Sequence, residues 1–127
     1  MACASNPAIE RTYHEDYEAQ IGFTQIIKHG GQLYLSGVTA SGPDMQLAVE
    51  TVYGKIKSIL AQHGATMGHV LKENLFTTDM SAFKKHLNTR KKYYTTGSYP
   101  AATWIEVKGL FMPEYVLEVE VIALVKK

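Results

Sequence analysis

The stretch that decides the fold is LEVEVIA, residues 117–123 of the 127-residue chain. Successive side chains point to opposite faces of a strand, so Leu117, Val119 and Val121 share one face. The two glutamates between them share the other face. A strand with one apolar and one charged face is typical of a sheet that is covered on one side only.

Upstream of this stretch, hydrophobic periodicity and turn residues predict five more strands and two helices. The upstream strands are expected over 9–13, 23–28, 32–37, 70–78 and 101–107, and the last strand over 115–125. A hairpin joins the second and third strands, because Gly30-Gly31 separates two β-rich runs and glycine reaches positive φ without steric cost.

The two helices are predicted from apolar residues spaced three and four apart. The first runs from about Asp44 to His63, and its stripe is Met45, Ala48, Val49, Val52, Ile56, Ile59 and Leu60. The second begins at Asp79 or Ser81 and reaches Tyr94 or Thr95, with an inner stripe of Met80, Phe83, Leu87 and Tyr94. Gly64 follows the first helix, and Gly97 with Pro100 closes the second.

This order of elements predicts an α+β fold: one domain over 1–127, with residues 1–8 as a loosely ordered arm. Two helices can cover only one face of a six-stranded sheet. The other face is expected to pack against a second copy of the chain, so the chain is predicted to be a homo-oligomer.

Composition excludes several classes of protein. Lys plus Arg (13) nearly balances Asp plus Glu (12), which disfavours a nucleic-acid binder. The single cysteine, Cys3, excludes an intrachain disulfide and a thiolate metal cage. The sequence shows no targeting segment and no apolar run of the roughly 20 residues that span a bilayer, so no membrane association and a cytoplasmic location are expected.

The charged face of the last strand holds the candidate catalytic group. Glu118 and Glu120 lie about 7 Å apart there, and partial desolvation of one carboxylate would suit it to activate water. The alternative is an exposed strand face with ordinary solvated acids. Glu106 would join the two acids only if residues 101–107 pair with the last strand as a hairpin. No histidine stands at metal-ligand spacing, so no metal is expected.

Other polar residues have a functional and a structural interpretation. The second helix carries Lys84, Lys85, Arg90, Lys91 and Lys92, which form either a phosphate-binding face or a solvated exterior. The pattern favours the exterior, because aromatic residues that would stack bases are missing from that face. The five histidines are scattered and are expected at surface or capping positions. Ser36 is a ligand contact or a turn residue. Asn88, which is mildly unfavourable within a helix, either bonds to a specific partner or lies on the solvated exterior.

Taken in order, several motifs resemble the Rid family, also called the YjgF or L-PSP family. They are Ser36-Gly37, residues 70–83 (VLKENLFTTDMSAF), Asn88, Tyr94, Pro100-Ala101 and the closing EVEVIA. The resemblance covers roughly residues 20 to 125. It implies a chorismate-mutase-like fold with two helices on one face of a six-stranded mixed sheet, and a homotrimer with ligand clefts between subunits. It also implies hydrolysis of reactive enamines and imines, such as 2-aminoacrylate, to 2-keto acids and ammonia.

The resemblance assigns site residues one by one. It places the water-activating glutamate at Glu118, the cleft serine at Ser36 and the helix asparagine at Asn88. Ala102 stands where the family has the arginine that clamps the substrate carboxylate, and Phe23 replaces a tyrosine. At Trp104 the family often has a smaller residue, and Tyr99 completes the candidate cleft.

The missing arginine changes the expected substrate. A guanidinium holds a carboxylate by two charge-assisted hydrogen bonds, and losing one such bond costs about 1.5–3 kcal/mol. Phe23 and Trp104 would make the cleft more apolar, which favours an uncharged, larger or aromatic ligand. The leading hypothesis is therefore hydrolysis of an enamine or imine without a carboxylate, or a related proton transfer, and it requires no cofactor.

Two other hypotheses remain open. The same trimer could bind a small organic molecule without turning it over. The third is ribonuclease or translation-inhibitor activity, a label attached to this family, which neither a histidine pair nor a basic groove supports in this sequence.

Overall fold

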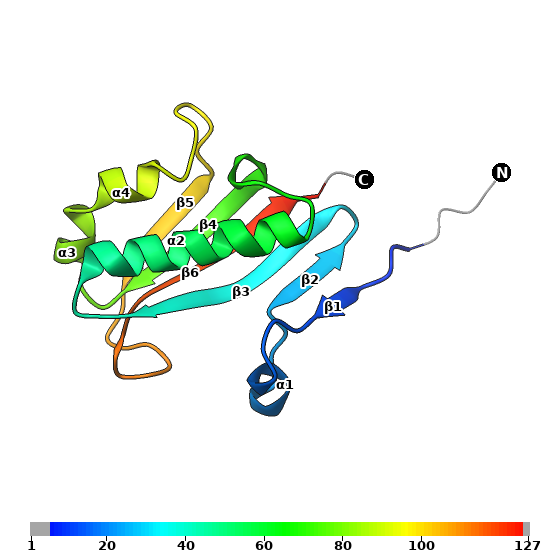
Figure 1. The fold of residues 1–127 in the computed structure, drawn as a ribbon, viewed down its shortest axis with the longest axis horizontal. Coiled ribbons are helices and arrows are strands. Elements are labelled where there is room, and N and C mark those ends of the chain that lie inside the picture. The colour runs from blue at the N-terminus through cyan, green and yellow to red at the C-terminus, as the bar shows by residue number, and fades with distance from the viewer. Residues whose placement is uncertain (1–5, 126–127) are drawn as a thin grey trace.

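The computed structural model describes residues 6–125, which form one six-stranded sheet with a long helix lying across it (Figure 1). The strands lie in the order β1-β2-β3-β6-β4-β5, and the β4–β5 pair is parallel while the other pairs are antiparallel. Their bounds are Glu10–Thr12 (β1), Ile26–His29 (β2), Gln32–Ser41 (β3), Val70–Thr77 (β4), Ala101–Glu106 (β5) and Tyr115–Leu124 (β6). The predicted α+β class and the six-stranded mixed sheet are confirmed. Most of the predicted arm over 1–8 cannot be compared with the structure, because residues 1–5 lie outside the described residues. Cys3 is one of them.

The hairpin between β2 and β3 has the turn that its glycines predict. His29 pairs with Gln32, so only Gly30 and Gly31 form the loop. Their φ angles are 57° and 83°, the positive values that a type I′ turn requires at both central positions.

The first predicted helix is α2 (Met45–Gln62). Asp44 caps it, because its carboxylate accepts a hydrogen bond from the backbone N–H of Leu47 at 3.1 Å. All seven residues of the predicted apolar stripe are buried, and Tyr53, which the stripe did not include, is fully buried beside them. Within residues 6–125, no helix is both long and apolar enough to cross a membrane.

The prediction of one continuous second helix is wrong. The segment forms two five-residue helices, α3 (Met80–Lys84) and α4 (Leu87–Lys91). The N–H groups of Lys85 and His86 donate to carbonyls three residues back, at Ala82 and Phe83, and these tighter bonds close α3. Neither glycine nor proline marks this break in the sequence. The pattern also missed α1 (Tyr17–Ile21) and the 3₁₀ turn η1 (Met67–His69).

Strand β5 occupies an edge of the sheet and does not pair with β6. It lies parallel to β4, so that Glu73 is opposite Ala102 and Leu75 is opposite Trp104. The hypothesis that Glu106 joins the acids of β6 through a hairpin is therefore wrong. Glu106 instead accepts the backbone N–H of Met80 at 2.9 Å and so holds the start of α3.

A fully buried carboxylate lies between the sheet and the helices. Glu73 on β4 is 0% exposed. Its Oε1 accepts the hydroxyls of Tyr53 (3.0 Å) and Tyr94 (2.7 Å), and its Oε2 accepts Nε of Arg90 (2.9 Å) and the indole N–H of Trp104 (2.8 Å). These five side chains, here called the Glu73 cluster, join α2, β4, α4, the segment after α4, and β5.

Arg90 supplies the counter-charge of the cluster. Its Nη2 lies 2.9 Å from Oε2 of Glu73, and only 4% of the residue is exposed. The expectation of a solvated position on the basic helix face is therefore wrong for Arg90. Burial by itself lowers the pKa of Arg90, but the Glu73 carboxylate and the Tyr53 hydroxyl more than offset this, so the net pKa is raised.

Removing one member of this buried pair should be far more costly than replacing both. We expect Arg90→Met alone to lower the free energy of unfolding by about 3–5 kcal/mol, because Glu73 is left charged and unpaired. The double variant Glu73→Gln/Arg90→Met should recover part of this loss, because the neutral amide oxygen still accepts hydrogen bonds from Tyr53 and Tyr94. Urea denaturation of the wild type, both single variants and the double variant at one protein concentration measures the coupling. Equal destabilisation in the single and double variants would contradict the described pairing.

Candidate functional site

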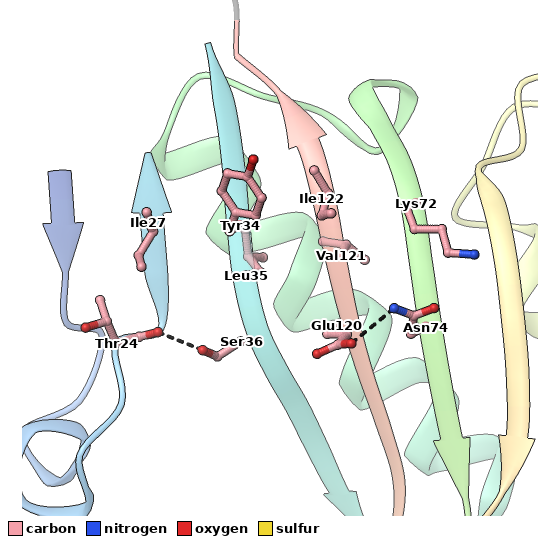
Figure 2. Close-up of a pocket in the computed structure, with 10 residues that line it drawn as sticks. All are labelled: Thr24, Ile27, Tyr34, Leu35, Ser36, Lys72, Asn74, Glu120, Val121 and Ile122. Atoms are coloured by element: carbon pink, nitrogen blue, oxygen red, sulfur yellow. Dashed lines mark hydrogen bonds between the residues drawn. The ribbon is translucent and has the colours of Figure 1, made fainter. Parts of the chain in front are cut away.

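Strand β6 shows the predicted alternation. Leu117, Val119 and Val121 are buried beneath the helices, whereas Glu118 and Glu120 lie on the opposite, uncovered face of the sheet, here called the open face. Glu120 lies between β3 and β4 in Figure 2, where its Oε1 accepts a hydrogen bond from the Asn74 amide at 3.1 Å.

A β-bulge places Ser36 beside these acids. The register passes from Leu35–Val121 to Val38–Val119, so Ser36 and Gly37 together lie opposite Glu120. The Ser36 hydroxyl donates to the carbonyl of Thr24 at 2.7 Å, which connects the bulge to the residue after Phe23 (Figure 2). Phe23 is partly buried, with its ring centroid 6.2 Å from that of Tyr17.

Gly37 makes room for the candidate base. A Cβ atom at this position would lie 2.7 Å from Cδ of Glu118, so any larger residue would displace the carboxylate. Glu118 is half-buried. Burial raises its pKa above the ordinary value, and the neighbouring Glu120 charge adds to the rise. This is the direction that the role of a general base near neutral pH requires.

The open face is hollowed around Glu120. A cavity of about 260 Å³ is lined by Thr24, Ile27, Tyr34, Leu35, Ser36, Lys72, Asn74, Glu120, Val121 and Ile122. Its one cation, Lys72, donates to the hydroxyl of Thr103 at 2.9 Å and extends toward β5 rather than toward Glu120 (Figure 2). The cavity therefore combines an apolar floor with a carboxylate and a serine hydroxyl.

A second cavity lies between α4 and β5 and has a volume of about 310 Å³. We call it the β5-edge cavity; its lining is Leu87, Arg90, Lys91, Tyr99, Pro100, Ala102 and Trp104. Trp104 lies on the helix-covered side of the sheet, since its indole reaches the buried Glu73, and Ala102 shares that side by alternation.

The described chain therefore separates the predicted site residues into two groups. Glu118 and Ser36 lie on the open face, with Phe23 next to the segment that holds Ser36. The predicted residues Tyr99, Ala102 and Trp104 line the β5-edge cavity. Asn88 belongs to neither group: it is exposed on α4, and the preceding Leu87 lines the cavity instead.

Sequence reasoning missed Arg90 and Glu73. A signal for Arg90 was present, because it lies three residues after Leu87 and four before Tyr94, in phase with the apolar stripe of the second helix. Glu73 was ambiguous, because both faces of residues 70–77 carry apolar and polar side chains.

Comparison with known proteins agrees with this geometry. The model of the family described as endoribonuclease L-PSP matches residues 14–125. The chain belongs to this family. Protein MMF1 of Saccharomyces cerevisiae, named as mitochondrial, is 29% identical over 115 residues, which are 85% of this chain and 78% of that protein.

Solved structures of the same family share the fold. A member of the YjgF/YER057c/UK114 family from Mycobacterium tuberculosis has a TM-score of 0.83 at 23% identity and covers 93% of this chain and 100% of its own. Yeast Mmf1 has a TM-score of 0.75 at 26% identity and covers 83% of this chain and 88% of its own. The expected family and the expected YjgF fold are both confirmed.

The raised pKa of Glu118 predicts a pH-dependent effect on stability. Folding favours the protonated carboxyl when the pKa in the folded state exceeds that in the unfolded state, so ionisation of Glu118 at neutral pH opposes folding. Glu118→Gln should therefore unfold at a higher temperature than the wild type at pH 7. This advantage should shrink as the pH falls through the raised pKa of folded Glu118, and it should be lost below the ordinary glutamate value of 4.5, where both states of the wild type are protonated. Calorimetry from pH 4 to 8 tests this, and an advantage that grows toward acid pH would contradict it.

Proposed function

We propose that this Rid-family protein hydrolyses an enamine or imine that lacks a carboxylate, in a cleft completed by a second copy of the chain. Glu118 is the base. The single observation that carries the proposal is its environment: a half-buried carboxyl with a raised pKa, held against Gly37 and beside the Ser36 bulge. A carboxylate so placed is able to take a proton from water near neutral pH.

The reaction balances with water as the only co-reactant. Glu118 accepts a proton from water, whose oxygen adds to the carbon of the C=N bond. That proton passes to nitrogen and gives a carbinolamine. The hydroxyl proton of the carbinolamine then moves to nitrogen as the C–N bond breaks, and a carbonyl compound and ammonia or an amine are released. An enamine first takes a proton on carbon to become the imine.

A homotrimer with intersubunit clefts is part of the proposal. Glu118 and the β5-edge cavity lie on opposite sides of one sheet, with β4 between β6 and β5. One chain therefore does not bring Ala102 and Trp104 to Glu118. The edge of a second copy placed against the open face would do so, and it would also cover exposed apolar side chains such as Ile105, 44% exposed.

The charges around Ala102 support a substrate without a carboxylate. Ala102 offers no cation, and the guanidinium of Arg90 is already paired with Glu73 at 2.9 Å. Tyr99 and Trp104, which are 40% and 38% exposed, present aromatic surface to the same cavity. An uncharged ligand with a flat apolar body fits these surroundings better than a small 2-imino acid does.

Other outcomes remain open to experiment. A trimer that binds such a molecule without turnover would use the same surfaces. Ribonuclease activity ranks third, because the burial of Arg90 removes one positive charge from the basic face of the second helix. The cytoplasmic location also stays a prediction, since the yeast relative is named as mitochondrial.

A pair of substrates tests the proposal directly. The protein should speed the hydrolysis of an imine of benzaldehyde, followed by release of the aldehyde, and should barely speed ammonia release from 2-aminoacrylate. Glu118→Gln should lower the first rate by about 10²-fold or more, because general-base catalysis contributes roughly 10²–10⁴-fold. Ala102→Arg should improve the reaction of 2-aminoacrylate by about tenfold or more.

Three results decide against the proposal. Fast hydrolysis of 2-aminoacrylate by the wild type would refute the substrate class. Unchanged imine hydrolysis in Glu118→Gln would refute the base. Binding of the imine without any hydrolysis would favour the non-catalytic alternative.

A further inference from the structure

The hydrogen bonds of Arg90 leave one nitrogen of its guanidinium free. Nε donates to Glu73 at 2.9 Å and to the Tyr53 hydroxyl at 3.2 Å, and Nη2 lies 2.9 Å from Glu73. Nη1 has no hydrogen-bond partner among residues 6–125. Every buried side-chain nitrogen and oxygen in that part of the chain does have a partner, so Nη1 is reached by solvent. Arg90 is one of the residues that line the β5-edge cavity.

Aromatic rings fix the orientation of this guanidinium. Its central carbon lies 4.8 Å from the ring centroid of Trp104 and 5.0 Å from that of Tyr94. The Trp104 ring is itself packed edge-on against Phe83, at 5.6 Å between centroids. Together with the hydrogen bonds to Glu73, these contacts hold Nη1 as a preoriented N–H donor.

The geometry points to Arg90 as the ligand anchor of the β5-edge cavity, with an uncharged, planar carbonyl or imine compound as the ligand. The acceptor atom of this ligand takes a hydrogen bond from Nη1 of Arg90, and its flat body lies against Tyr99 and Trp104. This inference rests on the proposed function, since the same cavity supplies one side of the proposed cleft. Ala102 offers no hydrogen-bond donor to a ligand there, and Arg90 supplies one instead.

Charge decides between a neutral and an anionic ligand. Glu73 already pairs with Arg90, so a ligand carboxylate would place a second negative charge on one buried guanidinium. Lys91 also lines the cavity, but its side chain is exposed, so its ammonium stays hydrated and screened. A neutral acceptor gains the hydrogen bond without this repulsion.

The size of the cavity limits the ligand to a small molecule. A volume of about 310 Å³ is at the lower end of the range for small-molecule sites. A single aromatic ring with one carbonyl substituent is of suitable size. Benzamide and benzoate have this form and nearly the same shape, and they differ in charge.

The test is an NMR titration of the full chain with these two compounds. Trp104 is the only tryptophan, so its indole N–H gives one cross-peak that reports on the cavity. Benzamide should shift this peak in a saturable manner and bind at least about tenfold more tightly than benzoate. No saturable shift with benzamide, or tighter binding of benzoate, would overturn the inference.

Three variants locate the anchor. Arg90→Lys keeps a cation beside Glu73 but loses the forked donor, and it should weaken benzamide binding about tenfold. Ala102→Leu fills the cavity and replaces no member of the Glu73 cluster, so it should weaken binding even if Arg90→Lys folds poorly. Lys92→Gln is the matched control: Lys92 is an exposed lysine directly after α4 that does not line the cavity, so benzamide binding should be unchanged.

The outcomes separate this inference from the proposed function. Unchanged benzamide binding in folded Arg90→Lys, survival of binding in Ala102→Leu, or loss of binding in Lys92→Gln would refute the anchor even if imine hydrolysis is observed. Binding is measured without turnover, so absence of hydrolysis, or an unchanged rate in Glu118→Gln, would refute the catalytic role of Glu118 and leave the anchor standing.

Discussion

A carboxylate that has no contact with water holds the two layers of this protein together. Glu73 projects from β4 toward the helices, and four donors from other parts of the chain surround it. The cost of burying its charge is offset only when all of these donors are in place. The positions of α4 and of the edge strand β5 therefore both depend on this one side chain.

The cluster also shapes the surface on which the proposed chemistry depends. Trp104 and Arg90 are bonded to the buried Glu73, and at the same time they line the β5-edge cavity. Groups that line a cavity and are locked by core contacts lose little conformational entropy when a ligand binds. On the open face, the bulge at Ser36-Gly37 determines where the Glu118 carboxylate lies, because the absence of a side chain at Gly37 leaves space for it.

Most of the fold follows from local pattern. Residues 44–63 carry an apolar stripe, a capping aspartate and a terminal glycine, and they fold as α2 at almost the expected bounds. The two-residue Gly30-Gly31 turn likewise fixes the register of β2 and β3, because both glycines adopt the positive φ that the turn requires. The partner of β5 was not predictable, because a strand at a sheet edge pairs according to the long-range arrangement of β4 and β6.

The site was predictable only in part. Alternation along 117–123 correctly placed Glu118 on the uncovered face, since one side of that strand is purely apolar. Ser36 lies on the same face, whereas Tyr99, Ala102 and Trp104 line a cavity on the other side of the sheet, and Asn88 lines neither cavity. Arg90 looked like one of several surface cations, because its burial depends on a partner 17 positions away in sequence.

The central claim is that the Glu73 cluster is a fixed part of the core and not a surface arrangement that opens readily. Native-state hydrogen exchange of the Trp104 indole N–H measures this most directly. We expect this hydrogen to exchange only through global unfolding, with an opening free energy that equals the stability of the protein and falls with denaturant at the same slope. Rapid exchange that is insensitive to denaturant would show that the bond to Glu73 opens by local motion, and it would contradict the account.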